Sequence, residues 1–247
     1  MKRYTGEGKK IDRSSVAVFR MILLVLIPII VFSIAVVPSV LILALYYLYL
    51  MPLIPHLLVS LLLLPFFLVI SFVILIISTA FFTGIFIRGF NIIYEHGSYS
   101  KSIKDKNTFK FTLYYILYRP TAKLLDIIFI PPIYARYLSL IGAKIGKHAF
   151  FGGRNTISDP CVTEIGSKTL IGGGATIMGH LGEQKLIIKK VTIGNHCLVG
   201  AESLIMPGVT MKDRSVLGGK SLVTKNTVLE SHTMYGGVPA VEIKKNK

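Results

Sequence analysis

The sequence predicts a two-part fold: an N-terminal transmembrane α-helical hairpin followed by an all-β parallel solenoid. Residues 21–87 contain no Asp, Glu, Lys or Arg. Residues 193–240 divide into hexads that each begin with an apolar residue, and a compact residue stands at the fifth place of every hexad. The uncharged stretch predicts membrane helices, and the two hexad positions predict a coiled β-structure.

The uncharged stretch is 67 residues long. One membrane-crossing helix needs about 20 apolar residues, so the stretch accommodates two long spans or, less comfortably, three. The segment Met51–His56, with two prolines, divides it in two. The stretch is too long for a signal peptide. Basic residues precede it within residues 1–20 and follow it from Arg88, while the short middle connection is uncharged. This distribution predicts two spans with both termini and the β domain on the cytoplasmic side.

The hexads exclude an ordinary helix or strand, because these repeat near 3.6 and 2 residues. In a solenoid, the first residue of each hexad points inward and stacks on its equivalent in the next coil, while the fifth supports a tight corner. The first places are Ile193, Val199, Ile205, Met211, Leu217, Val223, Leu229 and Tyr235. The fifth places are Cys197, Ser203, Val209, Ser215, Ser221, Thr227, Thr233 and Pro239.

The hexad phase changes twice before residue 193. Ile165, Ile171 and Ile177 share one register, and Ile145, Phe151 and Ile157 share another that is displaced by two residues around Asp159 and Pro160. Ile177 and Ile193 are 16 residues apart where 6 are expected, so ten extra residues leave the solenoid as a loop that contains His180. Such interruptions are where a solenoid places functional side chains.

These patterns predict four segments. Residues 1–20 form a basic cytoplasmic N-terminus, residues 21–87 a membrane domain, residues 88–140 interfacial or linker helices, and residues 141–247 the solenoid. Within the third segment, residues 119–140 are apolar but punctuated by charges. They are expected to lie along the membrane interface or, alternatively, to pack on the first coil.

Three stretches of the solenoid resemble the hexapeptide-repeat acyltransferases: residues 191–200, residues 205–209, and residues 217–225 together with 236–239. The entry segment, residues 140–146, is similar to that of membrane-associated members, including the terminal region of some nonribosomal peptide synthetase-like proteins. The resemblance implies a left-handed parallel β-helix, a homotrimer, and direct transfer of an acyl group, most often acetyl, from coenzyme A.

The resemblance implies that His180 is the general base, because the matching loop in the acetyltransferases carries a catalytic histidine. An imidazole titrates near neutral pH and can take a proton from an attacking hydroxyl or amine. Glu183 is a candidate to orient this imidazole, and Asp159 and Glu164, from the preceding coil, are alternative partners. The sequence leaves the choice among the three carboxylates open.

The resemblance also implies acetyl-CoA or another acyl-CoA as the donor, contacted largely by backbone along a groove. The residues at the corresponding positions are Gly200, Ala201, Gly218, Gly219, Thr224 and Lys225, and Lys225 suits a phosphate. Related enzymes often carry an arginine shortly after the Gly-Val-Pro sequence. Here Lys244 and Lys245 come next, so Lys244 is the candidate for the adenosine phosphate.

Two other readings remain open. Gamma-type carbonic anhydrases use the same fold with a three-histidine zinc site, but Lys185 stands where the second histidine would follow His180, so we expect no metal. The hexads could also form a non-catalytic trimeric membrane scaffold. Cys161 and Cys197 are too few for a metal cage and are interpreted as packing thiols.

The charge balance bears on the partners. The chain carries a net charge of +16, and residues 88–247 hold 22 Lys and Arg against 10 Asp and Glu. No nucleic-acid motif accompanies this charge, so anionic membrane lipids are the expected partners. Together these features predict a membrane-anchored O- or N-acetyltransferase that acts on a lipid-linked sugar, a glycolipid or another membrane-proximal envelope precursor.

Overall fold

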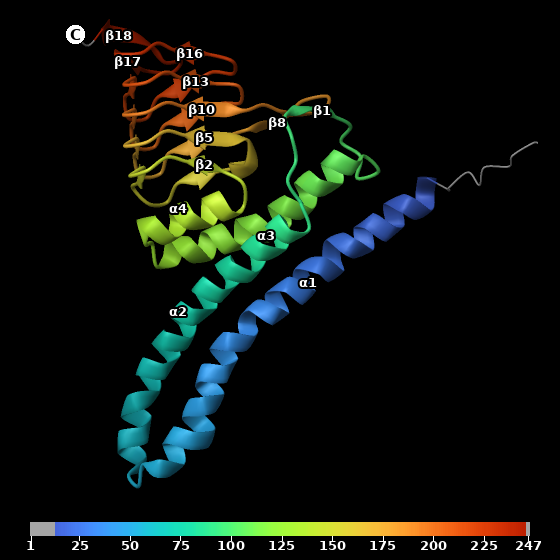
Figure 1. Ribbon diagram of the computed structural model, residues 1–247, viewed down its shortest axis with the longest axis vertical. Helices are drawn as coiled ribbons and strands as arrows, with labels where there is room; N and C mark the ends of the chain where they lie inside the picture. Colours follow the sequence, from blue (N-terminus) through green and yellow to red (C-terminus); the bar gives the residue numbers. More distant parts are fainter. Residues whose placement is uncertain (1–12, 246–247) are drawn as a thin grey trace, which may run out of the picture.

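A computed structural model describes residues 13–245 and contains a long helical hairpin beneath a column of stacked β-coils (Figure 1). Helices α1 (Arg13–Leu45) and α2 (Leu57–Gly89) form the hairpin, joined by a π-helical turn, η1 (Tyr46–Leu50), and a 3-10 turn, η2 (Met51–Leu53). The break lies within the proline-containing segment that the sequence indicates. Both arms are long and apolar enough to cross a membrane, at 39 residues (Ser15–Leu53) and 33 residues (Leu57–Gly89).

Small hydroxyl side chains hold the two long helices together. The Ser71 hydroxyl donates to the carbonyl oxygen of Ser39 over 2.8 Å, and the Ser78 hydroxyl donates to that of Ala35 over 2.6 Å. Close helix packing through small residues with interhelical hydrogen bonds is typical of helices in lipid. Many of the large apolar side chains of α1 and α2 point outward and are exposed.

Helices α3 (Lys106–Ile127) and α4 (Pro131–Leu140) lie between the hairpin and the base of the β-column, and we call them the helical platform (Figure 1). The Asp105 carboxylate caps α3 by accepting from two backbone N–H groups of its first turn. Pro131 begins α4, where a missing N–H costs nothing. Buried residues of both helices pack into the solenoid core, so residues 119–140 cover the first coil.

Buried tyrosines fasten this platform to the solenoid. The hydroxyl of Tyr114 donates to the carbonyl oxygen of Ile141 over 3.0 Å, and that of Tyr118 to the carbonyl of Ile157 over 2.6 Å. The hydroxyl of Tyr134 reaches the carbonyl of Asn155 over 3.2 Å. A buried phenol needs a hydrogen-bond partner, and these carbonyl groups provide it. The platform thereby closes the open end of the stacked coils.

The solenoid has three parallel sheets, which successive strands enter in turn. The first sheet contains β2 (Lys144–Ile145), β5 (Thr163–Ile165), β10 (Val191–Ile193), β13 (Thr210–Met211) and β16 (Val228–Leu229). The second contains β3 (Phe150–Phe151), β6 (Leu170–Ile171), β11 (Leu198–Val199), β14 (Val216–Leu217) and β17 (Thr233–Gly236), with β18 (Val241–Lys245) added antiparallel. The third contains β4 (Thr156–Ile157), β7 (Thr176–Ile177), β12 (Leu204–Ile205) and β15 (Leu222–Val223).

The hexad pattern has the structural meaning that the sequence predicts. The first-place residues face inward, and equivalent residues stack in register, as Ile193 does on Met211 and Val199 on Leu217. The fifth-place serines at positions 203, 215 and 221 are at most 2% exposed. The predicted fold class, a helical hairpin followed by a parallel solenoid of hexapeptide repeats, is confirmed.

The fourth places have a role that the sequence analysis did not identify. In the first seven hexads they adopt left-handed backbone conformations, with φ between +53° and +62° at the non-glycine residues, and these turn the chain at the corners. These residues are His196, Glu202, Arg214, Lys220, Asn226 and His232, and Gly208 belongs to the same series with φ +82°. A single residue of this conformation is unfavourable for most side chains, so the corner geometry must supply the compensation.

The ten extra residues form a β-hairpin and not an irregular loop. Strands β8 (His180–Gly182) and β9 (Leu186–Ile188) pair antiparallel, and β1 (Gly97–Tyr99), from the segment after α2, adds to β9 as a third strand. The two earlier extra residues are accommodated by η3 (Pro160–Val162). The sequence indicated a loop here, and the strand that extends the hairpin, β1, lies about 90 residues away in the chain.

Candidate functional site

Both irregular segments leave the solenoid at the same corner, where the chain turns from the third sheet to the first. The first follows β4 and precedes β5, and the second follows β7 and precedes β10. We call this edge of the solenoid the departure corner. Because β4 stacks on β7, the residues that follow these strands, Asp159 and His180, become neighbours.

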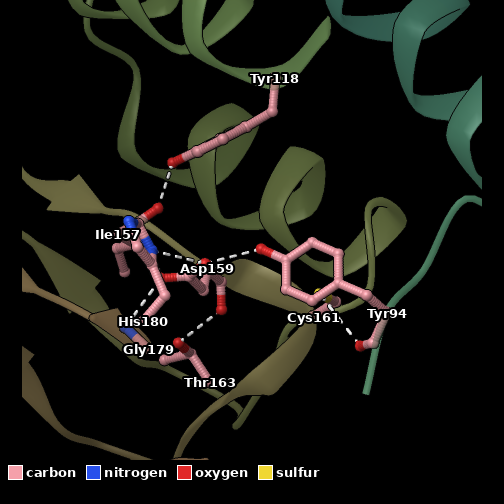
Figure 2. Close-up of polar contacts among 8 residues, drawn as sticks. All are labelled: Tyr94, Tyr118, Ile157, Asp159, Cys161, Thr163, Gly179 and His180. Atoms are coloured by element: carbon pink, nitrogen blue, oxygen red, sulfur yellow. Dashed lines mark hydrogen bonds and ion pairs between the residues drawn. The ribbon is translucent and has the colours of Figure 1, made fainter. Parts of the chain in front are cut away.

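The imidazole of His180 is paired with the carboxylate of Asp159 (Figure 2). The His180 Nδ1 atom lies 2.7 Å from Asp159 Oδ2 and 2.9 Å from Oδ1. The aspartate side chain is fully buried, and the histidine side chain is 21% exposed. A buried carboxylate stays in place only if its oxygens accept hydrogen bonds, and this one accepts several.

Two further donors surround the Asp159 carboxylate. The backbone N–H of Gly179 donates to Oδ2 over 2.8 Å, and the hydroxyl of Tyr94 donates to Oδ1 over 2.7 Å (Figure 2). With donors on both oxygens, the carboxylate accepts from a protonated Nδ1 of His180. The opposite nitrogen, Nε2, then carries the lone pair, which is the arrangement that a general base requires.

Aromatic rings from the helical platform hold the imidazole. The ring of Phe111 meets the His180 ring edge-on with centroids 4.9 Å apart, and the ring of Tyr115 does so at 6.1 Å. Both residues belong to α3 and lie one helical turn apart. The site therefore combines a solenoid corner, the hairpin that leaves it, and the helix beneath.

The other two candidate carboxylates pair with lysines. Glu183 lies between β8 and β9 and is exposed; its Oε1 is 2.8 Å from Lys225 Nζ, and this hydrogen bond lowers the pKa of the glutamate. Glu164 is 2.6 Å from both Lys144 Nζ and Lys190 Nζ. The structure thus brings neither Glu183 nor Glu164 to His180. It brings Asp159, and it adds Tyr94, which no sequence pattern indicated.

The residues predicted to contact coenzyme A lie mostly along the two edges of the third sheet. Gly200, Ala201, Gly218 and Gly219 stack at the corner between the second and third sheets, while Thr224 and Lys225 lie at the departure corner. A Cβ on Gly200 would lie 2.3 Å from the backbone nitrogen of Gly219, so this corner admits no side chain there. Lys244 is elsewhere: it is exposed on β18, opposite Met234 on β17.

The described residues offer no centre for a metal ion. Within residues 13–245, no group of three His, Cys, Asp or Glu side chains is placed to hold one. His148, His196 and His232 stand on different coils, at the corner between the first and second sheets, with left-handed backbones. Burial raises the pKa of Cys161 to about 12 and also raises the pKa of the Cys197 thiol, so both remain protonated thiols at neutral pH.

Comparisons with known proteins concern the solenoid. Residues 190–225 match the family model described as the hexapeptide repeat of succinyl-transferase. A search of curated proteins finds no match.

Solved structures with related coils include a hexapeptide-repeat acetyltransferase of Vibrio cholerae, at 20% identity over 52% of this chain and 90% of that chain, with a TM-score of 0.45. A maltose O-acetyltransferase of Clostridium difficile 630 is 19% identical over 62% of this chain and 94% of that chain, with a TM-score of 0.48. A galactoside acetyltransferase in complex with coenzyme A is 24% identical over 52% and 80%, with a TM-score of 0.42.

Proposed function

We propose that this hexapeptide-repeat protein is a membrane-anchored acyltransferase that moves an acyl group, most often acetyl, from coenzyme A to a hydroxyl or amine. The observation that carries the proposal is the Asp159–His180 pair at the departure corner of a solenoid whose residues 190–225 match the succinyl-transferase repeat. A buried carboxylate that orients a partly exposed imidazole is suited to general base catalysis.

The chemistry needs one proton acceptor and no covalent enzyme intermediate. Nε2 of His180 takes the proton of the acceptor hydroxyl or amine as its oxygen or nitrogen attacks the thioester carbonyl. The tetrahedral intermediate collapses, the carbon–sulfur bond breaks, and the proton passes from the imidazolium to the coenzyme A thiolate. Asp159 stabilises the imidazolium while it exists. The products are the acylated acceptor and coenzyme A.

The donor would lie against the third sheet, between the glycine-containing corner and the departure corner. At the corner between the second and third sheets, Gly200, Gly218 and Gly219 carry no side chains, and a pantetheine arm would contact the backbone there. At the other edge, Lys225 would bind a phosphate. Because Lys225 is paired with Glu183 without ligand, donor binding would compete with this exposed ion pair.

The acceptor would be a lipid-linked sugar, a glycolipid or another membrane-proximal envelope precursor. Two helices of sufficient length for a membrane precede the platform, and His180 contacts α3 of that platform through Phe111. This arrangement supports a site close to the bilayer surface. The basic residues on both sides of the hairpin support a cytoplasmic location, where coenzyme A is available.

An apolar ladder on the solenoid supports a homotrimer. On the outer face of the second sheet, Phe150, Leu170 and Leu198 stand in register on successive coils and are 40–51% exposed. The first sheet carries Lys144 and Glu164 at equivalent places. A continuous exposed apolar strip marks a surface for association.

Two measurements on the detergent-solubilised full chain test the function. Calorimetric titration with acetyl-CoA should show saturable binding by the wild type and by His180→Ala. Membranes containing each protein, supplied with radiolabelled acetyl-CoA, should label the lipid fraction only with the wild type. Absence of donor binding by a well-folded protein would favour the scaffold, and label transfer by His180→Ala at the wild-type rate would exclude this histidine as the base.

A further inference from the structure

Tyr94 connects the long helices to the Asp159–His180 pair. It lies in the short segment between α2 and β1, five residues after the end of α2, and it is 1% exposed. Its ring meets those of Phe111 and Tyr114 edge-on, each at a centroid distance of 5.2 Å. Its hydroxyl donates to Asp159 Oδ1 over 2.7 Å (Figure 2).

The hydroxyl of Tyr94 differs in its acceptor from those of the neighbouring buried tyrosines. Tyr114, Tyr118 and Tyr134 donate to backbone carbonyl groups and fasten the platform to the first coil. Tyr94 donates to a carboxylate that itself contacts an imidazole. Burial, followed by the charge of Asp159, raises the pKa of Tyr94 well above its usual value, so its hydroxyl stays protonated and a donor at neutral pH.

The two carboxylate oxygens are constrained in the same way. Oδ2 lies 2.7 Å from the imidazole Nδ1 and accepts from the N–H of Gly179, while Oδ1 lies 2.9 Å from Nδ1 and accepts from Tyr94. Each oxygen therefore has one donor besides the imidazole. Without the phenol hydroxyl, Oδ1 would keep only its longer contact with Nδ1, and the carboxylate would be held mainly through Oδ2.

We propose that Tyr94 is a positioning residue for the transfer reaction, acting through Asp159 to hold His180 in its reactive orientation. The inference rests on the proposed function. It makes the segment that follows the membrane hairpin a part of the active site and not only a tether.

The backbone around Tyr94 is itself fixed to the helices. The N–H of Ile92 donates to the carbonyl of Ile87 in α2 over 2.9 Å. The Lys110 ammonium on α3 donates to the carbonyl of Asn91 over 2.9 Å and to that of Ile93 over 3.4 Å. The position of the phenol thus depends on α2 and α3 together, and through them the helical hairpin contributes to the geometry of the pair.

The test compares Tyr94→Phe with Tyr114→Phe in the full chain. Each variant removes one buried hydroxyl and keeps its ring, so both should lower the midpoint of thermal unfolding by a similar amount, about 2–4 °C. Tyr94→Phe should also lower kcat about tenfold, the rate equivalent of one hydrogen bond, with the Kd for acetyl-CoA unchanged. Tyr114→Phe should keep kcat within about twofold.

A spectroscopic measurement distinguishes a change in the position of the His180 imidazole from a general loss of stability. In protein labelled with 15N-histidine, the His180 Nδ1 resonance, assigned with His180→Ala, should shift in Tyr94→Phe and stay in place in Tyr114→Phe. Equal loss of kcat in both variants, or a parallel weakening of acetyl-CoA binding in Tyr94→Phe, would overturn the positioning role. Undiminished transfer by His180→Ala in the same series would exclude His180 as the base and overturn this inference with it.

Discussion

The upper and lower coils of the solenoid differ in how closely they follow the six-residue period. Coils from residue 193 to 240 keep it without interruption, and their interior contains stacked apolar first-place residues with small fifth-place residues at the corners. The lower coils, from residue 141 to 190, depart from it twice, and they contain the buried Asp159, the hairpin and the contacts with the helical platform. The regular repeats form the scaffold, and the two interruptions of the period supply the residues of the candidate site.

The comparison also explains how residues 21 positions apart come together. Extra residues can leave a coil only where the chain turns, and both departures use the corner after the third sheet. Stacking of adjacent coils then places one extra segment over the other. A regular solenoid could not bury a carboxylate beside an imidazole in this way, because its interior positions accept apolar or small residues.

The largest expected effect on the transfer rate comes from replacing His180, and His196 serves as the comparison. His180→Ala should reduce transfer by about 10²–10⁴-fold, because it removes the proposed proton acceptor. His196, at a corner of the regular coils, has no such role, and His196→Ala should leave the rate within about twofold. The rate of acetyl transfer from labelled acetyl-CoA is measured with each purified variant. Equal losses of rate would contradict the assignment of the site to the lower coils and of the scaffold to the upper coils.

A smaller loss is expected for Asp159→Asn. An amide in place of the carboxylate cannot accept from all three donors and stabilises the imidazolium less, so kcat should fall about a hundredfold. Donor binding should be preserved, because the Asp159 side chain is fully buried and offers no surface to the donor. A full rate in this variant would show that the Asp159 contact is only structural.

Replacing one glycine by alanine in each region should have very different effects on stability. Gly200→Ala places a methyl group 2.3 Å from a backbone nitrogen of the next coil and should destabilise the chain by ~3 kcal/mol. Gly182→Ala, in the exposed hairpin, meets no atom within 4 Å and should change stability by less than about 0.5 kcal/mol. The midpoints of thermal unfolding of the two variants measure this difference. Similar midpoints would mean that the coils can separate at the Gly200 corner.

The ion pairs of Glu164 predict a pH-dependent effect. Burial tends to raise the pKa of this carboxyl, but Lys144 and Lys190 outweigh burial and lower it. A lowered folded-state pKa contributes stability above the unfolded value of about 4.3, and that contribution is lost as the pH falls through the folded value. Glu164→Gln should therefore cost about 0.5–1 kcal/mol at pH 7 and progressively less as the pH falls below the unfolded value. An undiminished difference in unfolding midpoints at pH 3 would refute this account.

The smallest effect is expected for Glu183→Gln. Its ion pair with Lys225 is exposed, and the side chain does not orient His180. Thermal unfolding should show no measurable change, and transfer should stay within about twofold of the wild type. A hundredfold loss of rate would instead make Glu183 the functional partner of the base.

Much of this architecture is recorded in the sequence because burial is periodic along the chain. The uncharged stretch specifies the helical hairpin, the first and fifth places specify the solenoid, and the spacing between Ile177 and Ile193 marks where His180 leaves it. Each of these signals arises from residues that are close in sequence.

Only the tertiary structure decided which groups meet. The sequence offered three carboxylates for His180, and the stacking of coils selected Asp159 while lysines engaged the other two. Tyr94 and strand β1 come from before the solenoid, 65 and about 90 residues from their partners. No periodic pattern records such contacts, because they depend on how the platform closes the base of the column, and that is set by packing between distant segments.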